Sequence, residues 1–251
     1  DMISPFKKFV GLQNFVKLAA DKQFFQTLLN TVIYVACTVG FGVGFGLILA
    51  VFLAKKTRLN GLLQSVAFSP YIVSLASIAL LWMWLMNNDF GFLNALLAVF
   101  GIPAIDWLGS PKFALMSLII INVWKSVGYN ALILVSALQG IPPHLYEAAR
   151  LDRANTWRTF SRITFPMISP TVFFLALVDV IAAFKVFETI QIITQGGPQN
   201  STNTLVFSLY EYGFQFYKVG YAAAIGVVLF FIVLLFTILY FAVLSKRVHY
   251  Q

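Results

Sequence analysis

The chain has 251 residues, of which 60% are hydrophobic and only 10% are charged. Soluble domains carry about a quarter charged residues, so this composition excludes an ordinary soluble core and indicates a membrane protein. The formal net charge of +8 would suit nucleic acid, but the basic residues lie beside apolar segments. That placement fits membrane orientation by the positive-inside rule, and we expect no nucleic-acid partner.

Residues near the start of the chain have the spacing of an amphipathic helix. Between positions 12 and 29, apolar side chains recur at three- and four-residue intervals, as in a helix that lies in the membrane interface. A plain extracellular linker is the alternative. We assign residues 1–25 to an extracellular or interfacial segment.

Five stretches are long and apolar enough to cross a membrane as helices, which takes about 20 residues each. Strands with free edges cannot satisfy their backbone groups in lipid, so we predict an all-α polytopic helical bundle. The predicted spans lie within Gln26–Ala54, within Leu63–Met86, over about Phe113–Leu138, over about Pro166–Phe187 and within Tyr221–Leu244.

Glycines alternate along the first span, at Gly40, Gly42, Gly44 and Gly46. Small residues four positions apart let two helices approach closely in a membrane. The approaching helix belongs either to this chain or to a partner subunit, and both interpretations fit the spacing.

Basic residues set the orientation of the spans. One group follows the first span, a second lies between the third and fourth spans, and a third follows the fifth span. Because consecutive spans cross the membrane in opposite directions, all three groups fall on the same side. That side is the cytoplasmic one, and it includes the C-terminus. The lysines of residues 1–25 then fall outside, so we expect a further transmembrane helix ahead of Asp1. The cytoplasmic groups are Lys55, Lys56 and Arg58, then Arg150, Arg153, Arg158 and Arg162, then Lys246 and Arg247; the outer lysines are Lys7, Lys8, Lys17 and Lys22.

Two charged residues interrupt the spans near the middle of the bilayer. Lys125 lies in the third span and Asp179 in the fourth, and a rise of about 1.5 Å per residue puts both close to the midplane. A charge there costs at least a few kcal/mol, so it should face a cavity or pair with another group. An ion pair between the two and a role in lining a substrate path are compatible alternatives.

Polar side chains share a helix face near Lys125. Asn122, Ser126 and Tyr129 follow one another at helical spacing and offer donors and acceptors for hydroxyl groups.

A charged segment between the third and fourth spans does not fit an otherwise apolar chain. Pro142 and Pro143 end the third span, and a short helix is expected from His144. Ala148 and Ala149 permit close approach by a partner, while Glu147 and Asp152 offer it acceptors. We therefore expect a water-soluble protein to dock on this segment.

The same segment resembles the EAA loop of carbohydrate-type binding-protein-dependent ABC importer permeases, the family of maltose, multiple-sugar and glycerol-3-phosphate systems. The matching positions are Glu147-Ala148-Ala149, Asp152, Ala154, Trp157, Phe160, Ile163-Thr164-Phe165-Pro166 and Pro170. Weaker matches occur at Phe9–Phe15, Asn30-Thr31, Phe68–Tyr71, Trp124-Lys125, Ala137–Pro142, Gly196–Pro198 and Ser245–Gln251.

The resemblance implies five helices of a six-helix permease core, with a permease domain over residues 26–251 and a cytoplasmic coupling loop over 140–165. It implies a bacterial cytoplasmic membrane location, a second homologous permease, two ATPase subunits that use ATP and Mg, and a solute-binding protein that contacts outer loops such as Gly196–Asn203. By matching positions, the ATPase-coupling residues are Leu145, Tyr146, Glu147, Ala148, Ala149, Leu151, Asp152, Arg153 and Ala154. The substrate-path residues are Tyr71, Ser74, Asn122, Lys125, Ser126, Tyr129 and Asp179.

One position departs from the family pattern. The family usually has glycine after the aspartate of the loop, where it permits a tight bend between two short helices. Here the residue is Arg153, which puts a copy of that bend in doubt.

The sequence holds no motif for catalysis. Cys37 is the only cysteine, and His144 and His249 are far apart, so we expect neither a disulfide nor a metal site. A phosphate-binding loop and a nucleophile elbow are also missing. We expect a transport subunit that is not an enzyme and binds no cofactor of its own.

A carbohydrate is the expected substrate. Import of glycerol-3-phosphate or a glycerophosphodiester by the same machinery is the alternative. An ion-coupled secondary transporter is a more distant one.

Overall fold

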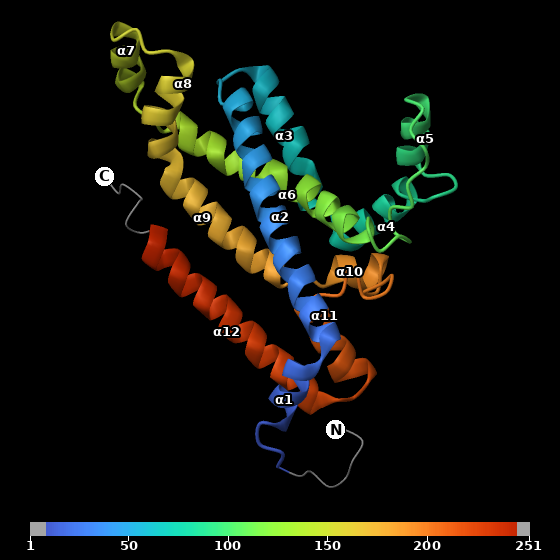
Figure 1. Cartoon of the computed structure of the whole chain (residues 1–251). Helices are drawn as coiled ribbons and strands as arrows, with labels where there is room; N and C mark the ends of the chain where they lie inside the picture. Colours follow the sequence, from blue (N-terminus) through green and yellow to red (C-terminus); the bar gives the residue numbers. More distant parts are fainter. Residues whose placement is uncertain (1–8, 245–251) are drawn as a thin grey trace. The chain divides into compact units, whose positions relative to one another are not determined.

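The computed structural model describes residues 9–244, with side chains through residue 242, and the described residues form helices without strands (Figure 1). The all-α prediction is therefore confirmed. Lys7, Lys8, Lys246, Arg247 and the matched ending Ser245–Gln251 lie outside the described residues. The helices are α1 (Gln13–Ala20), α2 (Lys22–Leu53), α3 (Arg58–Ile72), α4 (Leu75–Leu85), α5 (Phe92–Val99), α6 (Ala114–Gln139), α7 (Pro143–Leu151), α8 (Thr156–Thr159), the π-helical turn η1 (Phe160–Thr164), α9 (Phe165–Phe184), α10 (Glu188–Ile193), α11 (Leu205–Tyr210), the π-helical turn η2 (Glu211–Gln215) and α12 (Val219–Leu244).

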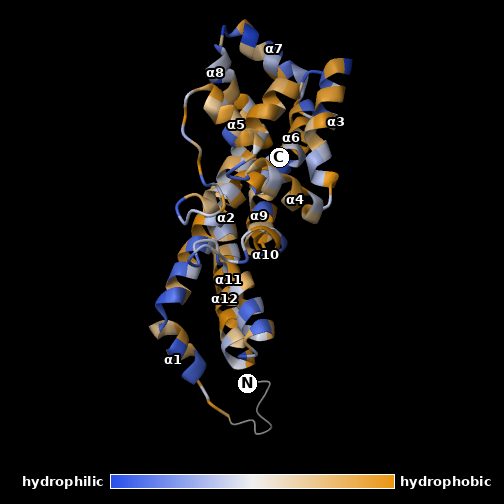
Figure 2. Cartoon of the chain, turned by 90° about the vertical axis from the view of Figure 1, so that its right-hand side faces the viewer, coloured by the Kyte–Doolittle hydropathy of each residue, from blue (hydrophilic) through white to orange (hydrophobic). Residues whose placement is uncertain are grey.

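Four helical stretches in the described part of the chain are long and apolar enough to cross a membrane. Their residues are mostly orange in Figure 2, whereas α7 carries many polar positions. They confirm the first, third, fourth and fifth predicted spans. They cover Lys22–Leu53, Ala114–Gln139, Thr156–Phe184 and Val219–Ala242.

The second predicted span is not one continuous helix. It consists of α3 and α4, which are separated by Val73 and Ser74, and it counts as a fifth span only if this broken pair crosses the membrane together. Ser74 precedes α4 with a non-helical backbone (φ −52°, ψ 135°). Pro70 lies in the last turn of α3 and has no N–H to donate, which weakens the helix just ahead of the break. Apolar composition alone could not reveal this interruption.

The amphipathic helix expected over residues 12–29 is wrong in its extent. Its first part is α1, but the chain is extended at Asp21 (φ −88°, ψ 112°) and then enters the long helix α2. The Asp21 carboxylate accepts a hydrogen bond from the Gln23 N–H at 2.8 Å. Aspartate stabilises a helix start in this way, so Asp21 caps α2 and separates it from α1.

The chain forms two compact units, each with its own core. The first comprises the described residues up to Cys37, Val73–Ile121 and Ile181–Leu235; the second comprises Thr38–Ile72, Asn122–Val180 and the described residues from Phe236. Buried apolar residues of the first unit are Leu18, Phe24, Leu205, Ala224 and Ile225. Those of the second are Ala50, Leu53, Ala131, Leu134, Val135 and Leu175.

Two of the alternating glycines let α2 approach α6 within the second unit. A Cβ atom added to Gly46 would lie 2.7 Å from the Asn130 Cβ, and one added to Gly42 would lie 3.0 Å from the Ser126 Oγ. A Cβ at Gly40 or Gly44 would meet nothing within 4 Å. One pair of glycines therefore serves packing inside the chain, and the other pair, Gly40 and Gly44, faces open space.

Candidate functional site

Helix α7 presents one buried and one exposed face in the loop between α6 and α9. Ala149 is buried, and the Tyr146 hydroxyl lies 3.2 Å from the hydroxyl of buried Thr164 in η1. Leu145 is half-buried, while Glu147 and Ala148 are exposed. Tyr146 and Ala149 thus hold α7 against the rest of the second unit, whereas Glu147 lies on the exposed face of the helix.

The end of α7 is a tight turn with Arg153 at its left-handed position. Arg153 has a φ of 53°, its N–H donates to the Arg150 carbonyl at 3.0 Å, and the Ala154 N–H donates to the Ala149 carbonyl at 2.9 Å. This pair of hydrogen bonds defines a Schellman motif, in which the left-handed residue is usually glycine. The bend that Arg153 put in doubt is therefore present, although a side chain there is strained.

Replacing Arg153 with glycine is expected to keep this turn and relieve its strain. A non-glycine residue in the left-handed region costs roughly 1 kcal/mol, so Arg153→Gly should raise the thermal stability of the purified chain slightly. Differential scanning fluorimetry measures the change, with Arg150→Gly, inside α7, as the destabilising comparison. A lower melting temperature for Arg153→Gly would contradict the assignment of strain to this position.

Beyond the turn, α8 carries an exposed tryptophan. Asn155 caps this helix, since its side-chain oxygen accepts the Arg158 N–H at 2.8 Å. Trp157 is 74% exposed, and Leu151 at the end of α7 is 85% exposed. Large exposed apolar groups are typical of contact sites for other proteins. We call the exposed residues Glu147, Ala148, Leu151, Asp152, Arg153 and Trp157 the docking surface.

Lys125 is satisfied by the end of a neighbouring helix. Its Nζ donates to the Tyr71 carbonyl at 3.0 Å and to the Pro70 carbonyl at 3.3 Å. The last carbonyls of a helix have no partner inside that helix, so the end of α3 attracts a cation. The Lys125 Nζ also lies 5.4 Å from the centre of the Tyr71 ring, and Tyr71 stacks on Tyr129 at 4.3 Å. The break after α3 supplies these acceptors.

Asp179 has a different partner on α6. Its carboxylate accepts a hydrogen bond from the Asn130 side-chain amide at 2.7 Å, and Asn130 is fully buried. The close approach of α2 at Gly42 brings Ser126, Asn130 and Asp179 together, because a Cβ there would lie within 4 Å of all three. The acidic and amide groups therefore form one polar cluster shared by α2, α6 and α9.

The predicted substrate-path residues fall into distinct places. Tyr71, Lys125 and Tyr129 form the contact between α3 and α6, and Ser126 lies beside the Asp179 cluster. Asn122 is half-buried on α6, and Ser74 is exposed just ahead of α4. Their contact with substrate stays a prediction, as does a direct pair between Lys125 and Asp179.

Two residues of these sites were missed from the sequence. Asn130 lies one helical turn beyond Ser126, on the same face as Asn122, so its spacing was a usable signal. Trp157 was part of the family match, but its exposure was not expected. A tryptophan within a charged loop was the signal for it.

The loop around the predicted Gly196–Pro198 turn is largely buried. Ser201, Thr202, Asn203 and Thr204 are buried, and the Asn30 side-chain amide donates to the Asn200 carbonyl at 2.9 Å and to the Asn203 carbonyl at 3.1 Å. Only Gln195 and Gln199 are exposed between positions 195 and 204. A partner could therefore contact the tip of this loop but not its whole length.

Known proteins resemble this chain over most of its length. Residues 42–250 match the family described as "Binding-protein-dependent transport system inner membrane component". The chain is 37% identical to the sn-glycerol-3-phosphate transport system permease protein UgpA of Agrobacterium fabrum, over 96% of this chain and 83% of the relative. It is 32% identical to the trehalose/maltose transport system permease protein MalF of Thermococcus litoralis, over 95% of this chain and 81% of the relative.

A solved structure has the same fold. It is a bacterial alginate ABC transporter in complex with an alginate pentasaccharide-bound periplasmic protein, and one of its chains superposes with a TM-score of 0.86 at 25% identity. The match covers 96% of this chain and 85% of that one.

Proposed function

Because the chain belongs to the family of binding-protein-dependent transport system inner membrane components, we propose that it is the permease subunit of an ATP-driven importer for a carbohydrate. The relatives at 32% and 37% identity are permeases of trehalose/maltose and sn-glycerol-3-phosphate systems. The polar clusters around Lys125 and Asp179 would lie along the path that the substrate takes across the membrane.

The docking surface is the observation that carries this proposal. It combines exposed Leu151 and Trp157 with charged Glu147, Asp152 and Arg153, on a short loop between two apolar helices. A chain that worked alone would gain nothing from exposing these groups, whereas an ATPase could seat on them and move α7. ATP and Mg would bind to that ATPase, and closure of the ATPase pair would tilt the spans so that access alternates.

The remaining partners follow from the same role. A second, similar permease would complete the path, and a solute-binding protein would deliver the substrate on the face opposite the docking surface. The basic residues near α7 and after α2 favour a cytoplasmic position for the docking surface and for the C-terminal end of α12. The chain would then lie in the bacterial cytoplasmic membrane as a multi-pass protein.

A neutral polyol suits the polar clusters better than an anion does. The Lys125 charge is met by two backbone carbonyls, and the Asp179 carboxylate is available to accept hydroxyl groups beside Asn130. An anion such as glycerol-3-phosphate would be repelled by Asp179. It remains the second candidate because of the likeness to UgpA.

Replacing Asp179 with asparagine separates these two substrates. For a neutral sugar we expect uptake with a KM about tenfold higher, since a hydrogen bond to a charged acceptor contributes roughly 1.5–3 kcal/mol. Uptake of glycerol-3-phosphate should stay absent in both forms. Transport of radiolabelled substrates into proteoliposomes measures both. Glycerol-3-phosphate uptake by the native chain, improved by Asp179→Asn, would make the anion the substrate instead.

The importer role itself is tested by purification and reconstitution. A tagged chain, expressed with its neighbouring genes, should co-purify with a second permease and an ATPase. Proteoliposomes containing that complex should accumulate a carbohydrate only with ATP and a solute-binding protein. Accumulation driven by an ion gradient without ATP would point to a secondary transporter and overturn the proposal.

A further inference from the structure

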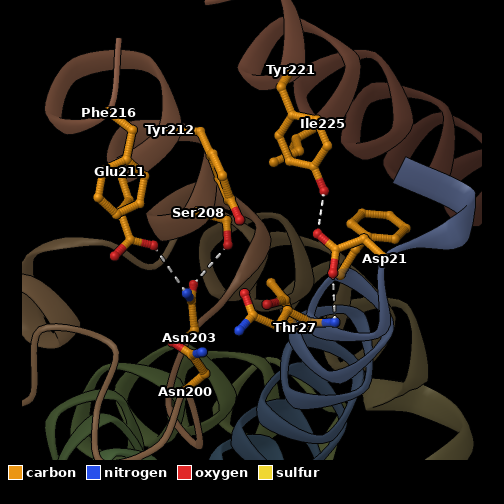
Figure 3. A pocket seen from close by; sticks show the side chains of 12 residues that line it. Asp21, Thr27, Asn200, Asn203, Ser208, Glu211, Tyr212, Phe216, Tyr221 and Ile225 are labelled. Atoms are coloured by element: carbon orange, nitrogen blue, oxygen red, sulfur yellow. Dashed lines mark hydrogen bonds between the residues drawn. The ribbon is translucent and has the colours of Figure 1, made fainter. Parts of the chain in front are cut away.

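A polar cavity of about 240 Å³ lies within the first unit, at the start of α2 and α12. Figure 3 shows it between the capping residue Asp21 and the η2 residues Glu211 and Tyr212, with Thr27 and Asn203 between them. These groups are remote in sequence from the docking surface and from the Lys125 and Asp179 clusters. The proposed function leaves the cavity without a role.

Two carboxylates reach this cavity, and none of its lining residues is basic. Asp21 accepts hydrogen bonds from the Tyr221 hydroxyl at 2.6 Å and from the Gln23 N–H at 2.8 Å. Glu211 accepts only a long bond from the Asn203 amide, at 3.4 Å, among the described residues. Glu211 therefore has acceptor capacity left for a ligand.

Burial disfavours the charged form of Glu211. Removal from water raises the pKa of Glu211 above its usual range, despite the opposing hydrogen bond from Asn203. Burial, followed by the charges of Asp21 and Glu211, also raises the pKa of Tyr212. Both carboxylates thus act on the same ring, which lies between them in Figure 3.

Thr27 adds a hydroxyl group that makes no hydrogen bond within the described residues. Its side chain is 97% buried, since only 3% is exposed, and its hydroxyl has no hydrogen-bond partner among the described residues. In Figure 3 the residue lies in the cavity between Asn203 and Asp21. The Thr27 hydroxyl is therefore available for a hydrogen bond to a ligand or a water molecule in the cavity.

The aromatic rings of the cavity favour an organic cation over a bare metal ion as its ligand. Tyr212, Phe216 and Tyr221 line the cavity, and the Tyr212 ring packs against Tyr221 at 4.6 Å. The exposed Lys218 already places its Nζ 5.8 Å from the centre of the Tyr212 ring, so this ring accepts a cation. A bare metal ion needs a tighter set of oxygen ligands, and the described residues contain no group of three or more His, Cys, Asp or Glu that could hold a metal.

We propose that this cavity binds an organic cation, an ammonium or guanidinium group, between Glu211, Asp21 and the face of Tyr212. The carboxylates would accept its N–H groups, the Thr27 oxygen would accept another, and the ring would contact its apolar face. The cation comes either from a small solute or from a lysine or arginine of the solute-binding protein. The second source rests on the proposed function, whereas the binding chemistry itself does not.

Calorimetry on the purified chain in nanodiscs tests the binding chemistry. Methylguanidinium is the probe, and methylurea is a neutral probe of the same shape. We expect binding of methylguanidinium alone, weakened about tenfold or more by Glu211→Gln and less by Thr27→Val, because hydrogen bonds to a charged group are the stronger ones. Asp89→Asn, a change at an exposed carboxylate, is the matched control and should bind as the native chain does.

The pH dependence gives a second readout. A cation prefers the ionised form of Glu211, so affinity for methylguanidinium should rise as the pH increases through the raised pKa of Glu211. Glu211→Gln should lose most of this dependence, because the variant lacks the carboxyl group whose pKa is raised. Lys218→Gln should leave affinity unchanged or raise it, since Lys218 lies near the same ring.

Three outcomes would overturn the proposal: equal binding of methylguanidinium and methylurea, unchanged binding by a folded Glu211→Gln variant, or tighter binding of Ca²⁺ than of methylguanidinium. Adding the solute-binding protein distinguishes the two possible sources of the cation. If methylguanidinium weakens its association with the native importer but not with Glu211→Gln, the cation belongs to that protein. If association is unaffected, the cation is a free solute. Failure of calorimetric binding leaves the importer role untouched, because uptake is measured independently.

Discussion

Replacing Glu147 with lysine is expected to abolish ATP-driven uptake while the chain still inserts and folds. Glu147 is exposed on α7, and its neighbours Tyr146 and Ala149 supply the contacts that hold this helix. Charge reversal therefore removes little from the fold. On the docking surface it places a cation where the ATPase would present basic groups, and such like-charge contacts cost several kcal/mol. That energy corresponds to a loss of at least about a hundredfold in association.

The measurement compares three properties of the variant complex: uptake in proteoliposomes, ATPase activity stimulated by the loaded binding protein, and retention of the ATPase during purification. Asp89→Lys is the matched control, because Asp89 is also an exposed carboxylate but lies outside the docking surface. It should transport normally. Full uptake by Glu147→Lys would mean that α7 is not where the ATPase docks.

Hydropathy predicted the long helices, and local sequence motifs predicted α7, because each of these helices depends on residues that are close together in the sequence. The spans that became α2, α6, α9 and α12 are long apolar runs, although Lys125 interrupts α6 and Asp179 interrupts α9. Such runs must form helices in lipid. The loop helix α7 was expected from its polar sequence after Pro142 and Pro143. In both cases the local pattern sufficed.

The features that the sequence could not supply depend on contacts between distant segments. The break between α3 and α4 makes the Pro70 and Tyr71 carbonyls available to Lys125, which lies on α6. Composition gave no reason to expect an acceptor there, so a charged partner was the natural expectation. Likewise, the hydrogen bond between Asp179 on α9 and Asn130 on α6 joins two distant helices. The spacing of polar residues along α6 places Asn130 on a helix face, but it does not bring Asp179 beside it.

Arg153 shows a different limit of sequence reasoning. The family's preference for glycine indicates that the backbone is left-handed at this position. It does not exclude other residues there when the surrounding hydrogen bonds fix the turn. Here two hydrogen bonds from Arg153 and Ala154 close the end of α7, and the chain accepts the strain. The arginine then adds a positive charge to the docking surface, which glycine could not provide.

Replacing Gly128 with alanine is expected to cause the largest loss of folded protein of any glycine-to-alanine change among the described residues. A Cβ at Gly128 would collide with the backbone carbonyl of Ala67 on α3. A side chain could rotate away from such a contact, but a carbonyl in a helix cannot, so α3 and α6 would have to separate. Overpacking of this kind typically costs 1–3 kcal/mol, and it costs more where the backbone itself is in the way.

The same displacement would remove neighbouring contacts that bear on transport. Lys125 lies one turn before Gly128 and depends on carbonyls of α3, and Tyr129 stacks on Tyr71. Separating the helices would leave the Lys125 charge poorly compensated within an apolar environment, which adds to the loss. The yield of monodisperse protein in detergent and its melting temperature should therefore both fall, and any inserted protein should transport poorly.

Gly44→Ala provides the matched control for this prediction. Gly44 is also a helix-interior glycine of the second unit, but a Cβ there would meet nothing within 4 Å. Alanine is the better helix former by roughly 0.5–1 kcal/mol, so this variant should be as stable as the native chain or slightly more stable. Equal stability of the two variants would show that α3 and α6 do not touch at Gly128. The position of Lys125 against the end of α3 would then have to be abandoned as well, because the same close approach brings its Nζ to those carbonyls.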